Sequence, residues 1–337
     1  MLPLVVTMGD PTGIGPELIL RTLAAGRLPQ KPLVVAGDLQ VLLNTATQLR
    51  LEPQVTASAD GRYVMRLADN SLLLQPLSQF EPQKLVTGAP DTACGQAMVD
   101  YVEWAIAECL AGRAAALITC PINKAAINAA GCNFPGHTEL LGERCAAKRV
   151  VMMLAGSRLR VTLVTIHTAL ANVPHQLTTT KILETIQITA ASMRQEFGLP
   201  NPRIAVLSLN PHAGEEGLFG DEEERLIRPA VDQAQRSGIA ASGPHSADTL
   251  FYFAARGDYD AVVCMYHDQG LIPLKLLHFD DAVNVTLGLP IVRTSVDHGT
   301  AYDLVGSGRA SIASLQAAIS MADRMADNRS NGKINDS

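Results

Sequence analysis

Three of the eight histidines in this chain directly follow apolar runs that are typical of buried strands. In open α/β sheets the ligand crevice lies at the carboxyl ends of the strands, so such side chains can meet at one edge. Three neutral imidazoles with an open coordination position are typical of a catalytic zinc-type site. The alternative is that each histidine only caps its strand or packs locally. The candidates are His167 after residues 161–166, His212 after 204–211 and His267 after 261–266.

Carboxylates accompany two of these histidines along the chain. Asp268 is next to His267, and Glu215 follows His212 within the same loop. A carboxylate that accepts a hydrogen bond from the second ring nitrogen fixes the tautomer of a metal-binding histidine. Each carboxylate is therefore either a partner of its histidine or a solvated loop residue.

A glycine-rich turn, GDPTGIG at residues 9–15, joins the first predicted strand to the first predicted helix. It resembles part of the dinucleotide-binding fingerprint, with Asp38 in the expected acidic position after the next strand. The third glycine of that fingerprint is replaced by Leu18. We therefore favour a structural turn that directs Asp10 into a cleft over a pyrophosphate site.

Two cations, Lys275 and Arg293, bracket a largely apolar segment that also contains Asn284. A cation among apolar residues needs a charged partner, and a substrate phosphate or carboxylate would serve. A structural ion pair is the alternative for each. A second loop that enters a helix, at residues 135–139, offers His137 and Thr138 as donors to a phosphate.

The spacing of apolar residues predicts short strands that alternate with longer amphipathic helices, which indicates βαβ units and a largely parallel sheet. We predict an α/β fold with two closely associated domains. Residues 52–90 are expected to be irregular, with weak strand signals. The predicted strands are 4–8, 33–37, 114–119, 149–155, 160–166, 203–209 and 261–266, and the predicted helices are 16–25, 95–111, 178–197, 222–236 and 311–325.

Composition excludes several classes of protein. The 337 residues are 47% hydrophobic and 18% charged, which excludes a disordered chain. A net charge of −6 and only 4% aromatic residues give no reason to expect nucleic-acid or anionic-membrane binding. The six cysteines form no CxxC pair and read as reduced thiols. Without a signal peptide or a long apolar stretch, we expect a cytoplasmic protein.

Five segments, taken together and in this order, resemble the 4-hydroxythreonine-4-phosphate dehydrogenase family of pyridoxal phosphate biosynthesis. The likeness extends over nearly the whole chain. The segments are MGDPTGIGPE (8–17), PGHTE (135–139), LNPHAGE (209–215), YHDQG (266–270) and RTSVDHGT (293–300).

This resemblance implies a fold like that of isocitrate and isopropylmalate dehydrogenases, with two α/β domains around a central cleft. It also implies a homodimer with a shared active site. The first domain is then expected at about residues 1–130 plus 270–326, and the second, with the dimer interface, at about 131–269. Residues 328–337 are expected to form a flexible tail.

The resemblance also implies roles for individual residues. One divalent metal ion (Zn, Mg or Co) is expected, with one of its three histidines from the partner subunit. NAD or NADP is expected without a Rossmann glycine fingerprint. Lys275 and Asp248 are the candidates for moving the hydroxyl proton. The implied metal ligands are His167, His212 and His267; the substrate contacts are His137, Thr138, Lys275, Asn284 and Arg293; the cofactor contacts are Asp248, Asn284 and Leu287.

The implied reaction is NAD(P)-dependent oxidation of 4-phosphohydroxy-L-threonine to a β-keto acid, which decarboxylates to 3-amino-2-oxopropyl phosphate in pyridoxine 5'-phosphate biosynthesis. Metal ions favour such a step by stabilising the developing enolate. A D-threonate or D-erythronate 4-phosphate dehydrogenase of sugar-acid catabolism is the close alternative, because such relatives share the metal and phosphate segments. An alternative of another class is a non-catalytic metal- or phosphate-binding protein on the same fold.

Overall fold

The computed structural model describes residues 1–134 and 136–335, and the chain divides into two compact units. Unit 1 contains Met1–Lys148 and Leu289–Ala326, and unit 2 contains Arg149–Gly288 with the C-terminal residues from Asp327 onward. Both divisions of the chain fall later than the expected 130 and 270. The later second division follows from the pairing of strand β12 (Val283–Leu287), which is antiparallel to β7 (Val151–Ala155) and so belongs to unit 2.

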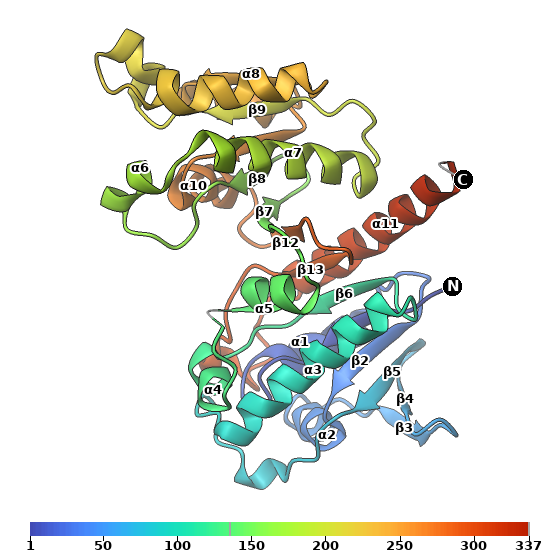
Figure 1. The fold of residues 1–337 in the computed structure, drawn as a ribbon. Helices are drawn as coiled ribbons and strands as arrows, with labels where there is room; N and C mark the ends of the chain where they lie inside the picture. The colour runs from blue at the N-terminus through green and yellow to red at the C-terminus, as the bar shows by residue number, and fades with distance from the viewer. Residues whose placement is uncertain (135, 336–337) are drawn as a thin grey trace. The chain divides into compact units, whose positions relative to one another are not determined.

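Unit 1 is built on a mixed sheet whose central strands are parallel and fully buried (Figure 1). Parallel strands that are covered on both faces read as continuous apolar runs, which is why the sequence showed them clearly. At one edge, β3 and β4 are antiparallel additions to β5, and both fall in the segment that was expected to be irregular. The strand order is β13 (Arg293–Val296), β6 (Ala116–Thr119), β1 (Leu4–Thr7), β2 (Leu33–Gly37), β5 (Asn70–Pro76), β4 (Tyr63–Leu67), β3 (Gln54–Ala57).

The glycine-rich turn of unit 1 is structural, as favoured from the sequence. A Cβ atom on Gly15, at the start of helix α1, would lie 2.0 Å from the carbonyl oxygen of Met8. Asp38, in the acidic position of the fingerprint, caps helix α2 by accepting a hydrogen bond from Val41 N at 3.0 Å. The helices of this unit are α1 (Gly15–Ala25), α2 (Leu39–Gln48), α3 (Thr92–Leu110), α4 (Lys124–Ala129), α5 (His137–Arg144) and the first part of α11 (Ala313–Asn335).

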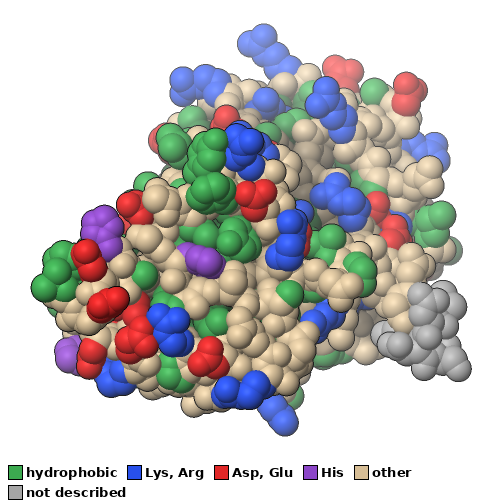
Figure 2. Space-filling model, turned by 90° about the horizontal axis from the view of Figure 1, so that it is seen from above, with side chains coloured by type: hydrophobic (Ala, Val, Ile, Leu, Met, Phe, Trp, Pro, Cys, Tyr) green, Lys and Arg blue, Asp and Glu red, His purple; other side chains and the backbone are tan. Residues whose placement is uncertain are grey.

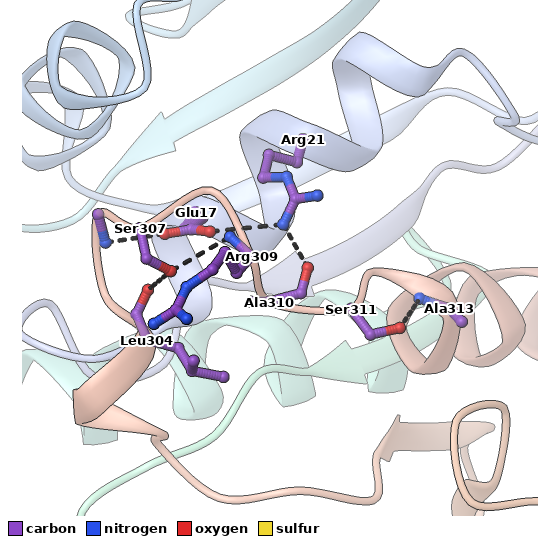
Figure 3. Close-up of polar contacts among 9 residues, drawn as sticks. Glu17, Arg21, Leu304, Ser307, Arg309, Ala310, Ser311 and Ala313 are labelled. Carbon is purple, nitrogen blue, oxygen red and sulfur yellow. Dashed lines mark hydrogen bonds and ion pairs between the residues drawn. The ribbon is translucent and has the colours of Figure 1, made fainter.

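A buried carboxylate connects helix α1 to the loop that follows β13. Glu17 has no solvent exposure; its Oε2 accepts a hydrogen bond from Gly306 N at 2.8 Å (Figure 3). Its Oε1 lies 3.5 Å from Arg21 Nη1, which also donates to the carbonyl of Ala310. These contacts fix the course of the chain between β13 and α11 within unit 1.

Unit 2 contains six strands of mixed direction, in which four parallel strands are followed by an antiparallel pair. Residues 149–155 and 160–166 were expected to be neighbouring strands, and β7 and β8 confirm this. The strand order is β10 (Ala241–His245), β9 (Ile204–Leu207), β11 (Ala261–Cys264), β8 (Arg160–Leu163), β7 and β12.

The helices of unit 2 pack on this sheet around a core that includes Leu207, Cys264 and Leu274. A π-helical turn, Glu223–Ile227, leads into α8. Within the described residues, no helix combines the length and the apolar character needed to cross a bilayer. The helices are α6 (Val173–Gln176), α7 (Thr179–Gln195), α8 (Arg228–Arg236), α9 (Ala247–Ala254) and α10 (His267–Leu277).

The polar C-terminal segment differs from the expected flexible tail. Helix α11 continues to Asn335, and Asn328 Nδ2 donates to the carbonyl oxygen of Glu196 at 2.8 Å. Arg329 lies 3.6 Å from the buried carboxylate of the same residue. Polar composition alone suggested fraying, but these contacts with the end of α7 hold the segment in place.

Candidate functional site

The three strands that lead to the candidate histidines are neighbours in the sheet of unit 2. Strand β11 lies between β9 and β8 and runs parallel to both. His167, His267 and His212 therefore follow the carboxyl ends of adjacent strands at one sheet edge. The expectation that one edge carries all three histidines is confirmed.

His167 and His267 lie together. Their ring centres are 5.7 Å apart, and both rings line a surface hollow of about 520 Å³. Nδ1 of His267 lies 2.6 Å from the carboxylate of Asp268, which leaves Nε2 directed away from this partner. The predicted partnership between His267 and Asp268 is therefore present. The hollow is lined by Ile166, His167, Thr168, Leu170, Val173, Tyr266, His267 and Asp268.

His212 does not join this pair. It is exposed, and it begins a run of five residues with left-handed backbone conformation, from His212 to Glu216. Its ring lies 6.3 Å from the ring of Phe219. Among the described residues, no three His, Cys, Asp or Glu side chains are grouped closely enough to hold one ion. The chain thus presents a histidine pair and a separate third histidine on one edge. The face in Figure 2 shows histidines at the surface among acidic and apolar side chains.

The carboxylate beside His212 is Asp248, and not the expected Glu215. Ser246 Oγ donates to Asp248 at 2.6 Å, and this bond together with the nearby His212 lowers the pKa of Asp248. Asp248 lies in the first turn of α9, which follows β10 at the same edge of the sheet. Glu215 makes no side-chain hydrogen bond with His212, although both residues are described.

A buried carboxylate that the sequence did not reveal supports the loop before His212. Glu223 is 1% exposed, and its Oε1 accepts hydrogen bonds from the backbone N–H groups of Leu209 and Asn210, each at 2.8 Å. Its Oε2 accepts from Asn210 Nδ2 at 3.0 Å. These bonds satisfy backbone donors at the point where β9 has ended.

Unit 1 gathers positive charge near the carboxyl end of β6, although Arg293 itself begins its own strand. Arg293 on β13 is 2% exposed, and its Nη2 donates to Thr119 Oγ1 on the neighbouring strand at 2.7 Å. Burial lowers the pKa of Arg293 to about 9. A buried guanidinium is costly for the free protein, and an incoming anion would offset that cost.

His137 and Lys124 lie beside this arginine within unit 1. Burial, together with the charges of Arg293 and Lys124, holds the pKa of His137 well below its usual range. Nε2 of His137 is closed off from solvent and has no hydrogen-bond partner among the described residues. The side chain of Lys124 runs past Gly136, the residue before α5, with Cε 3.5 Å from where a glycine Cβ would lie. Thr138 follows in the first turn of α5, and Pro135, earlier in the same predicted loop, lies outside the described residues.

Lys124 was missed in the sequence, although a signal was present. It follows strand β6 at the carboxyl edge of the unit 1 sheet, as the three histidines follow their strands in unit 2.

A buried network also holds the nearby glycine-rich turn. Tyr302 OH donates to Asp10 Oδ2 at 2.7 Å and accepts from Asn123 Nδ2 at 2.7 Å. Asp10 is thus fully buried and engaged, and it does not open into a cleft as expected.

The other predicted residues lie in unit 2. Lys275 is in α10, the helix that begins at His267. Asn284 lies on β12, and its Oδ1 is buried with no hydrogen-bond partner among the described residues. An unsatisfied buried acceptor of this kind calls for a ligand donor. Leu287 is fully buried and paired with Val151, so its side chain is not available for the predicted cofactor contact.

Comparison with known proteins decides the family. Residues 29–322 match the family model described as "Pyridoxal phosphate biosynthetic protein PdxA". The chain belongs to this family. The 4-hydroxythreonine-4-phosphate dehydrogenase of Geobacter metallireducens is 55% identical over 98% of this chain and 97% of its own length.

Solved structures agree with this assignment. A crystal structure of 4-hydroxythreonine-4-phosphate dehydrogenase from Klebsiella pneumoniae covers 97% of this chain and 100% of its own, at 39% identity and a TM-score of 0.85. A terephthalate 1,2-cis-dihydrodiol dehydrogenase from Burkholderia xenovorans matches at 28% identity and a TM-score of 0.65, over 95% of this chain and 97% of its own. The predicted family, the α/β fold and the dehydrogenase class are confirmed.

Proposed function

We propose that this chain oxidises 4-phosphohydroxy-L-threonine with NAD or NADP. The product is a β-keto acid, which loses CO₂ to give 3-amino-2-oxopropyl phosphate for pyridoxine 5'-phosphate biosynthesis. The observation that carries the proposal is the 55% identity, over nearly the whole of both chains, to a relative named for this substrate. The sugar-acid phosphate dehydrogenase alternative has no comparable support among these relatives.

The cation cluster of unit 1 supports a phosphorylated substrate. Arg293 and Lys124 bring positive charge close to His137, whose Nε2 is buried without a hydrogen-bond partner among the described residues. Arginine forms strong, geometrically specific bonds with phosphate, whereas lysine acts on it as a point charge. We assign the phosphate to these three residues, with Thr138 as a further donor. Binding there would position the reacting carbon, which lies at a distance from the phosphate.

The histidines of unit 2 fit a divalent metal ion. Two imidazoles that share one ion at ~2.0–2.1 Å have ring centres roughly 5–6 Å apart, and His167 and His267 are 5.7 Å apart. Imidazole nitrogen suits zinc and cobalt, whereas Mg²⁺ prefers oxygen ligands. Of the three expected metals, the donor set therefore favours zinc or cobalt. The separate position of His212 supports a site that two subunits complete together.

The roles of the chain's own groups follow from this arrangement. When bound, the metal supplies Lewis acidity at the substrate oxygen and the nicotinamide accepts the hydride. Asp268 orients the ring of His267 through the 2.6 Å contact with Nδ1. We assign the orientation of His212 to Asp248, whose carboxylate lies near that ring, and we keep Lys275 as the candidate for moving the hydroxyl proton. Asn284 offers its free Oδ1 to a donor of the substrate or the cofactor.

An exposed apolar surface close to His267 in the chain supports a homodimer. Ile272 and Leu276 on α10 and Phe279 just beyond it are 67%, 85% and 79% exposed. Large exposed apolar side chains that lie this close together mark interaction sites. We propose that a second copy covers this surface, which starts on the helix that begins at His267. A location in the cytoplasm remains part of this proposal.

A turnover assay tests the proposed function directly. The purified chain is supplied with Co²⁺ or Zn²⁺, NAD or NADP, and one of three substrates, while NADH or NADPH formation is followed. We expect turnover with 4-phosphohydroxy-L-threonine and much less with D-threonate 4-phosphate or D-erythronate 4-phosphate. Preference for either sugar-acid phosphate would establish the catabolic alternative, and no turnover with any of the three would favour a non-catalytic role.

A further inference from the structure

A single buried side chain connects the strand ends that lead to His267 and His212. Gln269 lies in the first turn of α10, two residues after His267, and is 8% exposed. Its Oε1 accepts a hydrogen bond from Met265 N at 2.7 Å, and its Nε2 donates to the carbonyl oxygen of Ser208 at 2.6 Å. Met265 follows β11 and Ser208 follows β9, so the amide spans two neighbouring strands.

The Gln269 amide lies just beyond the point where the backbone pairing of β9 and β11 ends. The backbone pairing of β11 with β9 extends only to Val263 and Val206. Beyond that point the Gln269 side chain takes the place of the missing ladder bonds. Both of its polar ends are engaged, which a buried amide requires. The distance between the two chain segments is therefore set by one rigid planar group.

The segment before His212 is held from a second side as well. Glu223 binds the N–H groups of Leu209 and Asn210, while Gln269 binds the carbonyl of Ser208. Ser208 N also donates to the carbonyl of His245 at 2.8 Å. Because these bonds fix three consecutive residues, the left-handed turn that begins at His212 starts from a defined position.

We propose that Gln269 is a positioning residue for the metal site: it holds the segments that carry His267 and His212, so that each histidine enters a site shared by two subunits from a fixed position. This inference rests on the proposed function, since it takes both histidines as metal ligands. The role requires a donor at one end of the side chain and an acceptor at the other. Glutamate keeps the acceptor but places a carboxylate oxygen against the Ser208 carbonyl, and methionine keeps the volume but loses both bonds.

Co²⁺ binding to the metal-free, full-length chain tests this role without turnover. We compare Gln269→Glu and Gln269→Met with Gln235→Glu, because Gln235 Nε2 also donates to a backbone carbonyl of unit 2, that of Ala241, at 2.9 Å. Calorimetric titration gives the Kd, the visible spectrum reports the Co²⁺ coordination, and a thermal melt reports stability. We expect both Gln269 variants to bind Co²⁺ at least about tenfold more weakly, with an altered spectrum. The Gln235 variant should match the wild type in both.

The outcomes separate the two proposals. Unchanged Kd and spectrum in the folded Gln269 variants, together with lost binding in His212→Ala, would overturn the role of Gln269 and leave the metal site standing. Binding that is equally weak in the Gln235 control would also overturn it, because the effect would then be general. If the wild type and His212→Ala bind Co²⁺ alike, the metal site itself is wrong, and the role of Gln269 falls with it. If Gln269→Glu does not fold, the volume-conserving methionine variant decides the matter.

Discussion

In unit 1 the predicted substrate contacts Arg293 and Nε2 of His137 are closed off from solvent, whereas in unit 2 two of the three predicted metal ligands are exposed and their supports are buried. Arg293 is 2% exposed, and Nε2 of His137 is inaccessible. In unit 2 His167 and His212 are exposed, while Gln269 and Glu223 beneath them are 8% and 1% exposed. In unit 1 the buried groups are the predicted substrate contacts themselves, whereas in unit 2 the buried groups are the residues that support the predicted metal ligands.

This difference follows from the chemistry of the two ligands. A phosphate is bound most strongly by charges that have already lost their water, because a low local dielectric strengthens the attraction. A metal ion needs ligands with correct direction and spacing, which buried hydrogen bonds to the backbone can supply. Substitutions in unit 1 should therefore act through charge and solvation, and substitutions in unit 2 through alignment.

Removal of a metal ligand is expected to have the largest effect. His267→Ala should lower kcat/KM by about a thousandfold or more, since metal-ion catalysis contributes several kcal/mol. Metal content after dialysis and steady-state kinetics measure the two consequences. His175→Ala is the matched control, because His175 is an exposed histidine of the same unit that does not line the hollow. Full activity of a metal-stripped His212→Ala enzyme would contradict the metal assignment.

The sequence predicted this part of the site because strand ends are readable. Buried parallel strands appear as apolar runs, so the residues that follow them can be assigned to one edge without a structure. His167, His212 and His267 were found in this way, and Lys124 after β6 could have been. The separation of His212 from the His167–His267 pair was not predictable. It depends on a left-handed turn that begins at His212, and the residue types in that turn do not indicate this backbone conformation.

The supports of the site were beyond the reach of the sequence for another reason. Gln269 contacts Ser208 and Glu223 contacts Leu209, across long stretches of chain, so their roles exist only once the strands are side by side. The boundary between the units was misplaced because β12 looks like any apolar run until its antiparallel pairing with β7 is seen. Long-range pairing, and not local propensity, decided each of these features.

Replacement of the buried arginine is expected to have the next largest effect. Arg293→Met should raise the KM for substrate roughly ten- to a hundredfold, since a charge-assisted bond is worth about 1.5–3 kcal/mol. The melting temperature should stay nearly constant or rise, because an apolar side chain of similar length replaces a buried cation. Arg113→Met, which changes an exposed arginine of unit 1, should alter neither quantity. A large loss of stability with an unchanged KM would show that Arg293 is structural.

Protonation of His137 at low pH is expected to have a smaller effect, which is measured on the folding stability of the protein. The folded-state pKa of His137 lies below its unfolded value, so the neutral ring contributes stability that is present above pH ~6.5 and is lost as the pH falls. The stability difference between wild type and His137→Asn should therefore shrink on acidification, by up to about 1 kcal/mol per pH unit. Thermal melts from pH 7.5 down to 5.5 measure this trend, with His175→Asn as the control. Parallel curves for wild type and His137→Asn would argue against a buried neutral His137.

The smallest effect is expected at Lys124, and its salt dependence sharpens the comparison. Lys124 is exposed, unlike Arg293, so its attraction for phosphate is weakened by water and screened by salt. Lys124→Met should raise the KM only about three- to tenfold at low ionic strength, with little change in kcat. At about 0.5 M salt the difference from wild type should nearly disappear, whereas the defect of Arg293→Met should persist because that charge is buried. Lys84→Met, at an exposed lysine paired with Glu81, is the matched control and should leave the KM unchanged. If high salt removes both KM defects equally, then Arg293 is solvated when substrate binds. Burial would then not be what strengthens phosphate binding in unit 1.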